Sequence, residues 1–243
     1  MIYSYTGIET HLDFGFGVTA EAYFESAKAL KDIDKDALSA TQQLHLPPMF
    51  LARHSIELYL KSLIIIFHKK LKIDYGEERF DSLKPVICIN DKWKPLFTLH
   101  WIDELYSYWL NHLLIPNQDK LYQIAPRGDW REVAKIHELF NYISKYDKDS
   151  SYFRYPITKN TQRDHEKYTM REVDPRKFFG GDTEDKDEPK KVILAIINDD
   201  REIVSAYEKN DDVLSDLLDN LLEVADFLHN THFMSRMTLC GKY

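Results

Sequence analysis

The sequence predicts an all-α protein, a helical bundle that carries a charged, partly irregular insertion. The first observation is a stretch from Pro47 to Lys70 that is mostly apolar and has neither Gly nor Pro between Met49 and Phe67. The second is a stripe of apolar residues at helical spacing over residues 211–233. The third is the small number of turn residues: 8 Gly and 9 Pro among 243 residues are fewer than an all-β sandwich would need.

The stretch from Pro47 to Lys70 is expected to be the central helix of the bundle. Proline is favoured in a first helical turn, where its missing N–H costs nothing, and Pro47-Pro48 stand there. Since each helical residue turns by about 100°, the polar side chains fall within one arc: Arg53, His54, Glu57, Lys61 and His68. Nearly everything outside that arc is apolar, so most of the helix should be buried. The arc is either a solvated edge with an i,i+4 pair of Glu57 and Lys61, or a charged seam that faces a groove or a partner subunit.

Three further helices are expected before residue 150, and they cover residues 20–31, 99–114 and 129–146. Thr19 can cap the first of them. The second should end at Pro116, because proline cannot continue helical hydrogen bonding. The third opens on a capping box, in which Asp129 is followed three residues later by Glu132. After the central helix, the letters VICI indicate one short strand within a loop.

Residues 158–191 are expected to form an insertion. They divide the chain into a helical core over 1–157, the insertion itself, and C-terminal helices over 192–243 that complete the bundle. A short hairpin fits residues 163–178, and the glycine-led acidic run after it fits a solvated loop or a mimic of nucleic acid. Two helices are expected beyond the insertion, over residues 191–209 and 211–233.

Composition limits the classes of protein that fit. A formal net charge of −8 argues against a general electrostatic hold on nucleic acid, although a local basic patch is compatible with it. Cys88 and Cys240 lie far apart in unlike contexts, so neither a disulfide framework nor a metal cluster is expected. The N-terminus lacks the pattern of a signal peptide, and the longest apolar run, Leu63–Phe67, is too short to cross a membrane. We therefore expect a soluble, cytoplasmic protein without a membrane partner.

The sequence has none of the common cofactor motifs. It contains no Walker loop, no dinucleotide-binding glycine pattern, no Cys-x-x-Cys and no His-Glu-x-x-His. His229 and His232 are three residues apart near the end of the last predicted helix. They fit a helix C-terminus, where imidazolium is favoured, better than a metal site, which needs further ligands. No cofactor and no metal ion are therefore expected.

Several short motifs follow one another along the chain. They are Glu57 with Lys61 in the central helix, His100 at the start of the next, and Arg154-Tyr155-Pro156 in a loop that leads toward the last helix. In this order, and with the AEAYFESAKAL helix before them, they resemble the HEPN (higher eukaryotes and prokaryotes nucleotide-binding) domain superfamily. The resemblance covers residues 20–157 and the C-terminal helix. It implies an HEPN-like helical bundle, of which this chain would be a divergent member.

The resemblance also implies a reaction. Many members of the superfamily are ribonucleases of toxin–antitoxin and anti-phage systems, and the active ones carry Arg, four to six residues, then His. Arg131 and His137 meet that spacing. The histidine would be the general base for the ribose 2′-OH, and the arginine would stabilise charge on the scissile phosphate without a metal. The chain departs from the pattern because Glu132 follows the arginine and because the pair precedes the Arg-Tyr-Pro loop. Residues six apart on a helix also point about 120° away from each other.

Two functions are therefore carried forward. One is a component of a prokaryotic toxin or anti-phage defence system that acts as a metal-independent endoribonuclease at Arg131 and His137. The other is a non-catalytic, HEPN-like dimeric scaffold or sensor, which the acidic charge and the imperfect motif favour. It would bind a nucleotide, RNA or a partner protein of the same system in a groove formed by Arg53, Glu57, Lys61 and Arg154. Arg154 would either bind phosphate or pair with Glu57. A homodimer is implied by either function.

Overall fold

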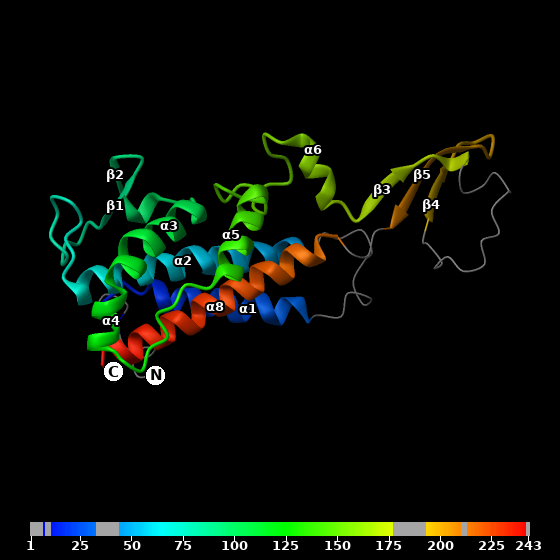
Figure 1. Ribbon diagram of the computed structural model, residues 1–243. Coiled ribbons are helices and arrows are strands. Elements are labelled where there is room, and N and C mark those ends of the chain that lie inside the picture. The colour runs from blue at the N-terminus through cyan, green and yellow to red at the C-terminus, as the bar shows by residue number, and fades with distance from the viewer. Residues whose placement is uncertain (1–6, 8–10, 33–43, 177–192, 210–212, 242–243) are drawn as a thin grey trace.

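Three long helices form the centre of the protein. The computed structural model describes residue 7 and residues 11–32, 44–176, 193–209 and 213–241. Helices α1 (Phe16–Lys31), α2 (Leu46–Leu71) and α8 (Ser215–Leu239) lie side by side along the body (Figure 1). Helices α3 and α5 lie over one side of these three, and a three-stranded sheet stands off one end of the body (Figure 1).

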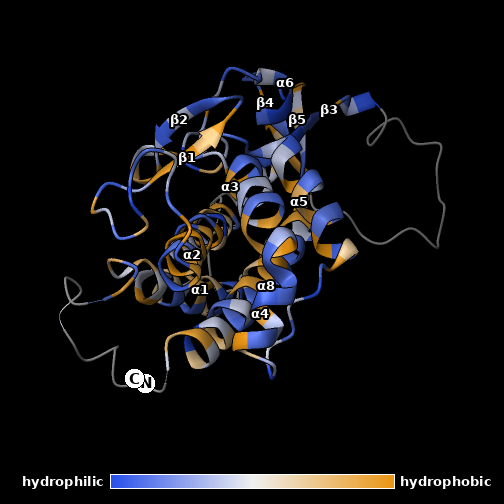
Figure 2. Cartoon of the chain, turned by 60° about the vertical axis from the view of Figure 1, so that its left-hand side comes forward, coloured by the Kyte–Doolittle hydropathy of each residue, from blue (hydrophilic) through white to orange (hydrophobic). Residues whose placement is uncertain are grey.

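Helix α2 runs through the middle of the body, as the sequence predicts. Its apolar side chains from Met49 to Phe67 are almost all fully buried. The apolar faces of α1, α2 and α8 are turned toward one another, and the hydrophilic residues lie mainly on the outside (Figure 2). Burial of one Leu or Ile side chain stabilises a fold by about 1.5–3 kcal/mol, so this helix supplies a large part of the core. Within the described residues, no helix is long and apolar enough to span a membrane.

Helix α8 confirms the predicted apolar stripe and is longer than expected at its C-terminal end. It begins at Ser215 and ends at Leu239. The residues of the stripe that are buried in it are Leu217, Leu218, Leu221, Ala225 and Leu228. On the opposite face, Asp216, Asp219 and Asp226 are exposed. The amphipathic pattern therefore packs α8 against α2, within the chain.

The helical segment after the central helix does not stop at Pro116. Helix α3 (Ile102–Tyr108) continues into a π-helical turn over Trp109–Leu114, a 3-10 turn over Ile115–Asn117 and helix α4 (Gln118–Ile124). Pro116 lies in the first turn of the 3-10 segment, where a missing N–H is tolerated. The expected helix end at Pro116 is therefore wrong, and the chain changes there from one helical type to another.

Two of the predicted caps are wrong. Helix α5 spans Ala134–Tyr146 and begins after the expected capping box. The Asp129 carboxylate accepts hydrogen bonds from the Arg131 side chain and does not cap a helix. Helix α1 begins at Phe16, so Thr19 lies inside it. The first turn of α1 is capped by Asp13, whose Oδ2 accepts the backbone N–H of Gly17 at 3.0 Å.

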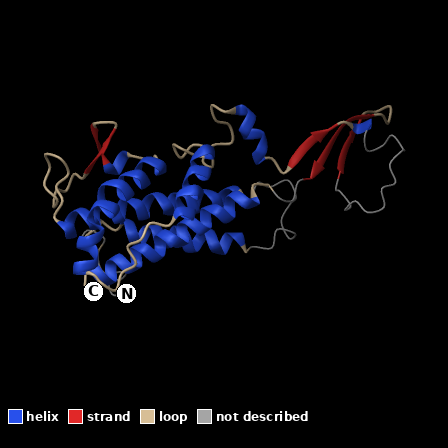
Figure 3. Cartoon of the chain, viewed as in Figure 1, coloured by secondary structure: helices blue, strands red, loops and turns tan. Residues whose placement is uncertain are grey.

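The predicted all-α fold class is wrong, because the protein also contains two antiparallel sheets (Figure 3). Strands β1 (Val86–Ile89) and β2 (Lys92–Pro95) form a hairpin. Its first strand is the short strand expected at the letters VICI. Strands β3 (Met170–Val173), β5 (Ile203–Lys209) and β4 (Ile193–Ile197) form the second sheet in that order, here called the outer sheet.

The outer sheet replaces the helix predicted over 191–209. Ile193–Ile197 are apolar without interruption, and such a short run has no periodicity that separates a strand from a buried helix. Its β-branched residues favour the strand. Strand β3 lies within the predicted insertion and pairs with β5 beyond it, Val173 opposite Ala206. The acidic run over 182–188 lies outside the described residues.

Candidate functional site

A ladder of charged side chains lies in the interior along helix α2. Arg53, Glu57 and Lys61 recur every four residues, so they stand above one another on one face of the helix. All three are almost completely buried. Glu57 joins the other two: its Oε2 is 2.5 Å from Nη1 of Arg53 and its Oε1 is 2.9 Å from Nζ of Lys61. We call these three residues the charged ladder. A solvated edge is therefore excluded, and the ladder forms a charged seam within the chain.

The charged ladder holds two loops against α2. On one side, Lys61 donates a hydrogen bond to the Phe97 carbonyl at 3.1 Å, and Arg53 donates one to the His100 carbonyl. Both acceptors precede helix α3. On the other side, Nε of Arg53 lies 3.2 Å from Oδ2 of Asp147, directly after helix α5. The chain before α3 and the chain after α5 are therefore tied to the same helix.

Burial and pairing shift the acidic groups of this network in opposite directions. Burial alone would raise the pKa of Glu57, but the charges of Lys61 and Arg53 outweigh it and lower the pKa to about 2. For Asp147, burial prevails over the attraction of Arg53, and the pKa is raised above its usual value. Glu57 therefore keeps its charge in the interior, whereas Asp147 is the carboxyl group that takes up a proton more readily.

His100 stands where the charged ladder reaches the surface. Its Nδ1 lies 3.0 Å from Oε1 of Glu57, and 46% of its side chain is exposed. A buried carboxylate that accepts the Nδ1–H of a histidine fixes the ring orientation and leaves Nε2 as the acceptor. The pair has the arrangement that a general base requires.

Beyond Asp147, the loop after α5 forms one wall of an open cleft. Oδ1 of Asp147 accepts the backbone N–H of Tyr152 at 2.9 Å and so fixes the turn. The cleft has a volume of about 470 Å³ and lies between the end of α5 and residues 155–163. Its lining includes four cationic side chains, Lys145, Lys148, Lys159 and Arg163, and one carboxylate, Asp149. We call it the cationic cleft.

Two of the four cationic side chains of the cleft have partners among the described residues, and two do not. Lys148 pairs with Asp103 at 3.2 Å, and the Arg163 guanidinium lies over the Tyr146 ring, 5.1 Å from its centroid. Lys145 and Lys159 are exposed, and no described carboxylate lies within ion-pair distance of either ammonium. Two positive charges are therefore available to an anion at the mouth of the cleft.

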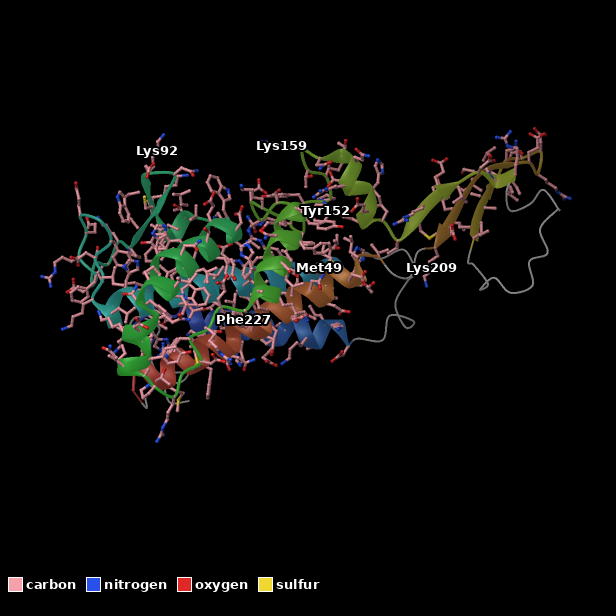
Figure 4. All side chains as sticks on the ribbon, viewed as in Figure 1. Met49, Lys92, Tyr152, Lys159, Lys209 and Phe227 are labelled. Carbon is pink, nitrogen blue, oxygen red and sulfur yellow. The ribbon has the colours of Figure 1, made fainter. Side chains whose placement is uncertain are left out.

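The far wall of the cationic cleft is braced by a second buried ion pair. Nζ of Lys167 lies 2.7 Å from Oδ1 of Asp164 and donates to the Tyr155 carbonyl at 3.0 Å. The same ammonium lies over the Tyr152 ring, 4.1 Å from its centroid. Tyr152 and Lys159 are labelled on this part of the chain in Figure 4. The brace holds Tyr155 at the rim, where 52% of it is exposed.

Arg154 and the charged ladder do not form the groove that the sequence predicts. Arg154 is exposed, donates to Oγ of Ser150 at 3.2 Å, and lies over the Phe50 ring. Its predicted pairing with Glu57 is wrong, since the Glu57 carboxylate is occupied by Arg53, Lys61 and His100. The ladder itself is too deeply buried to contact a ligand. It positions the loop that carries the cationic cleft.

Arg131 and His137 lie in separate pockets of the chain. Arg131 precedes α5, pairs with Asp129 at 2.7 Å, and lines a cleft of about 430 Å³ against α8. His137 lies on α5 beside Tyr106 and lines a pocket of about 240 Å³ against α3. Within one chain the two side chains are not brought together.

The two histidines of α8, His229 and His232, contact side chains of neighbouring segments of the chain. Nδ1 of His229 is 2.7 Å from the Tyr59 hydroxyl, and Nε2 of His232 faces Oδ2 of Asp13 at 3.6 Å. In the part of the chain that the structure describes, no group of three His, Cys, Asp or Glu side chains could hold a metal ion.

The sequence reasoning missed the cationic cleft and the role of Asp147. A signal for the cleft was present, because lysines, arginines and tyrosines are dense between residues 142 and 163 of an otherwise acidic chain. No pattern in the sequence around Asp147 indicates its role, because its partner Arg53 lies far away in the chain. Comparison of the chain with protein-family models, with curated proteins and with solved structures finds no match.

Proposed function

We propose that the protein binds single-stranded RNA, with the phosphates and one base held in the cationic cleft. The observation that carries the proposal is the gathering of four cations against one carboxylate around a cleft of about 470 Å³, in a chain with a net charge of −8. An acidic protein repels polyanions in general, so such a local reversal of charge favours a defined anionic ligand.

The cleft offers the two contacts that single strands use. Phosphates can be met by Lys145 and Lys159, whose ammonium groups are exposed. A base can stack on the Tyr155 ring at the rim, half of which is exposed. Stacking on an aromatic side chain contributes about 1–3 kcal/mol per base and tolerates any base. The ligand is therefore expected to be recognised by its backbone and an unpaired base, with little sequence preference.

This function corresponds to the HEPN-like binding scaffold inferred from the sequence. The resemblance to the superfamily is part of the proposal and is supported by the order of motifs along α2, α3 and the loop after α5. In a toxin or anti-phage defence system, such a scaffold would sense RNA or a nucleotide and pass the signal to a partner protein.

Fluorescence anisotropy with a labelled single-stranded oligoadenylate would test the proposal. The paired substitution Lys145→Glu with Lys159→Glu is expected to weaken binding at least about tenfold. The control is the pair Lys84→Glu and Lys92→Glu. Both are exposed lysines of the β1–β2 region and neither lines the cationic cleft, and Lys92 lies apart from Lys159 in Figure 4. The proposal fails if the wild type does not bind or if both pairs weaken binding equally. Competition by ATP at equal phosphate concentration would identify a nucleotide as the ligand instead.

The endoribonuclease remains a second candidate function because of His100. Its contact with Glu57 leaves Nε2 available at the surface, as a general base for a ribose 2′-OH requires. In this version of the reaction, His100 would replace His137 as the base.

Cleavage of end-labelled RNA in EDTA would test the second candidate. Wild type, His100→Ala and His137→Ala are compared. Loss of cleavage in His100→Ala alone supports the Glu57–His100 pair, and loss in His137→Ala alone supports the site predicted from the sequence. No cleavage, or equal cleavage by all three proteins, leaves RNA binding as the function.

A further inference from the structure

Strand β4 lies at one edge of the outer sheet. The order of the sheet is β3–β5–β4, so of the described strands only β5 pairs with β4. An edge strand presents unpaired N–H and C=O groups, and a further strand can complete them. The sheet stands away from the central helices (Figure 3), and no described element covers the outer edge of β4.

The two edges of the outer sheet differ in their chemistry. Strand β3 carries Arg171 and Glu172 and is followed by Asp174-Pro175, and charges and proline are features that protect an edge from pairing. Strand β4 reads Ile-Leu-Ala-Ile-Ile and carries neither a charge nor a proline, and its pairing with β5 shifts register between Ile196 and Ile197. Leu194, Ile196 and Ile197 are 53%, 46% and 61% exposed. Neither charge nor proline therefore protects this apolar edge.

We propose that β4 pairs with β4 of a second copy of the chain, antiparallel and centred on Ala195, to form one continuous six-stranded sheet. A two-fold axis makes each contact occur twice, so a strand at the axis must be compatible with itself. In this register Leu194 faces Ile196 of the partner subunit, and Ile193 faces Ile197 of the partner subunit. Every cross-strand pair is apolar, and no charge faces its own copy. A charged edge centred on one of its charges would lack this self-complementarity.

The position of the outer sheet is compatible with such a dimer. The short edge strand limits the affinity of the dimer. The outer sheet lies beyond the ends of α2 and α8 (Figure 1), so joining two edges keeps the two helical bodies apart. One strand from each copy buries less than the roughly 1,200–2,000 Å² of a standard stable interface. Dimerisation is therefore expected to depend on protein concentration. The proposed interface does not include the cationic cleft.

Sedimentation velocity of the full chain between about 1 and about 200 µM tests the proposal. The wild type is expected to pass from monomer to dimer in this range. Leu194→Lys and Ile196→Glu should each raise the dissociation constant at least about tenfold, because each places an unpaired charge on the apolar edge. The control is Val204→Lys on the central strand β5, at a residue that is 58% exposed. It should leave the dissociation constant unchanged.

The double variant Leu194→Lys with Ile196→Glu separates self-pairing of β4 from misfolding of the outer sheet. In the proposed register the new lysine faces the new glutamate of the partner subunit, so dimerisation should return toward the wild-type level. A merely misfolded sheet would not recover. The proposal is overturned if the wild type stays monomeric throughout the range, if the double variant is as weak as the single ones, or if Val204→Lys has the same effect. Dimerisation unaffected by all variants would assign it to another surface.

Discussion

At the scale of single residues, the Glu57 carboxylate is the shared anion of the contacts between helix α2 and the loop before α3. It pairs with Arg53 and Lys61 on its own helix and with His100 outside it. Replacing a whole buried ion cluster by apolar residues can be neutral, but removing one partner leaves an uncompensated charge in the interior. The network is therefore sensitive to any single change.

Glu57→Gln is expected to lower the free energy of unfolding by about 3 kcal/mol, because Arg53 and Lys61 then lose their shared countercharge. Urea denaturation at pH 7 measures this. The control Glu25→Gln removes one half of an exposed i,i+3 pair with Lys28 and should change the free energy by less than about 0.5 kcal/mol. Similar losses in both variants would contradict the structural role given to Glu57.

His68 predicts a loss of stability in mild acid. Burial lowers its pKa to about 4, against the opposing effect of the Ile73 carbonyl, while the unfolded chain titrates near the usual value of about 6.5. Between these values the unfolded chain binds a proton that the folded chain does not. The free energy of unfolding therefore decreases as the pH falls from 6.5 to 4, by roughly 3 kcal/mol, and the penalty is absent above pH 6.5.

Urea denaturation of wild type and His68→Gln at pH 7 and pH 4.5 measures this penalty. The substitution should reduce the difference between the two pH values. The control is His165→Gln at an exposed position, which should leave the difference unchanged. An identical pH dependence in all three proteins would show that His68 is not the responsible group.

At the scale of elements, the crossing of α1 and α8 depends on a residue without a side chain. A Cβ added to Gly17 would lie 2.2 Å from Nε2 of His232 and 2.9 Å from Oδ2 of Asp13. The same Asp13 carboxylate accepts hydrogen bonds from the Gly17 amide and from Ser62 on α2. Close approach at this glycine therefore joins all three central helices.

Gly17→Ala should destabilise the protein by about 2 kcal/mol, although alanine is the better helix former, because the added methyl group overpacks the crossing. The melting temperature from circular dichroism checks this. The control Ala29→Ser adds one atom at an exposed position of the same helix. It should change the melting temperature far less. A higher melting temperature for Gly17→Ala would mean that the crossing can relax.

At the scale of the whole molecule, the charge distribution predicts how binding responds to salt. In the proposed RNA complex, the net charge of −8 would oppose binding, while the lysines of the cationic cleft would favour it. For single strands, the logarithm of the binding constant falls with the logarithm of the salt concentration by about 0.7 per phosphate contact. The two available cations, Lys145 and Lys159, therefore correspond to a slope of about −1.4.

The pair Lys145→Gln with Lys159→Gln should reduce this slope by about 1.4. Anisotropy titrations between about 50 and about 200 mM NaCl measure it. The pair Lys84→Gln with Lys92→Gln should leave the slope unchanged. An unchanged slope in the first pair would mean that the cleft does not contact phosphate.

Sequence patterns determined the elements whose signals are long and local. The central helix follows from a mostly apolar stretch of more than five helical turns, free of Gly and Pro, that comes directly after Pro47-Pro48. Helix α8 follows from the stripe of leucines between Leu217 and Leu228. Periodicity identifies such segments because burial on one face must repeat every 3.6 residues. Part of the candidate site was visible in the same way, since Arg53, Glu57 and Lys61 share one face at a spacing of four.

Only the tertiary structure decided the rest. The run Ile193–Ile197 becomes a strand because β5 pairs with it, and no local pattern contains that partner. The charged ladder is a buried tether because Asp147 and His100, distant in sequence, meet it in space. The cationic cleft exists because α5, its following loop and the Lys167–Asp164 brace converge. A sequence records which side chains are available, whereas burial and charge pairing depend on which distant segments close around them.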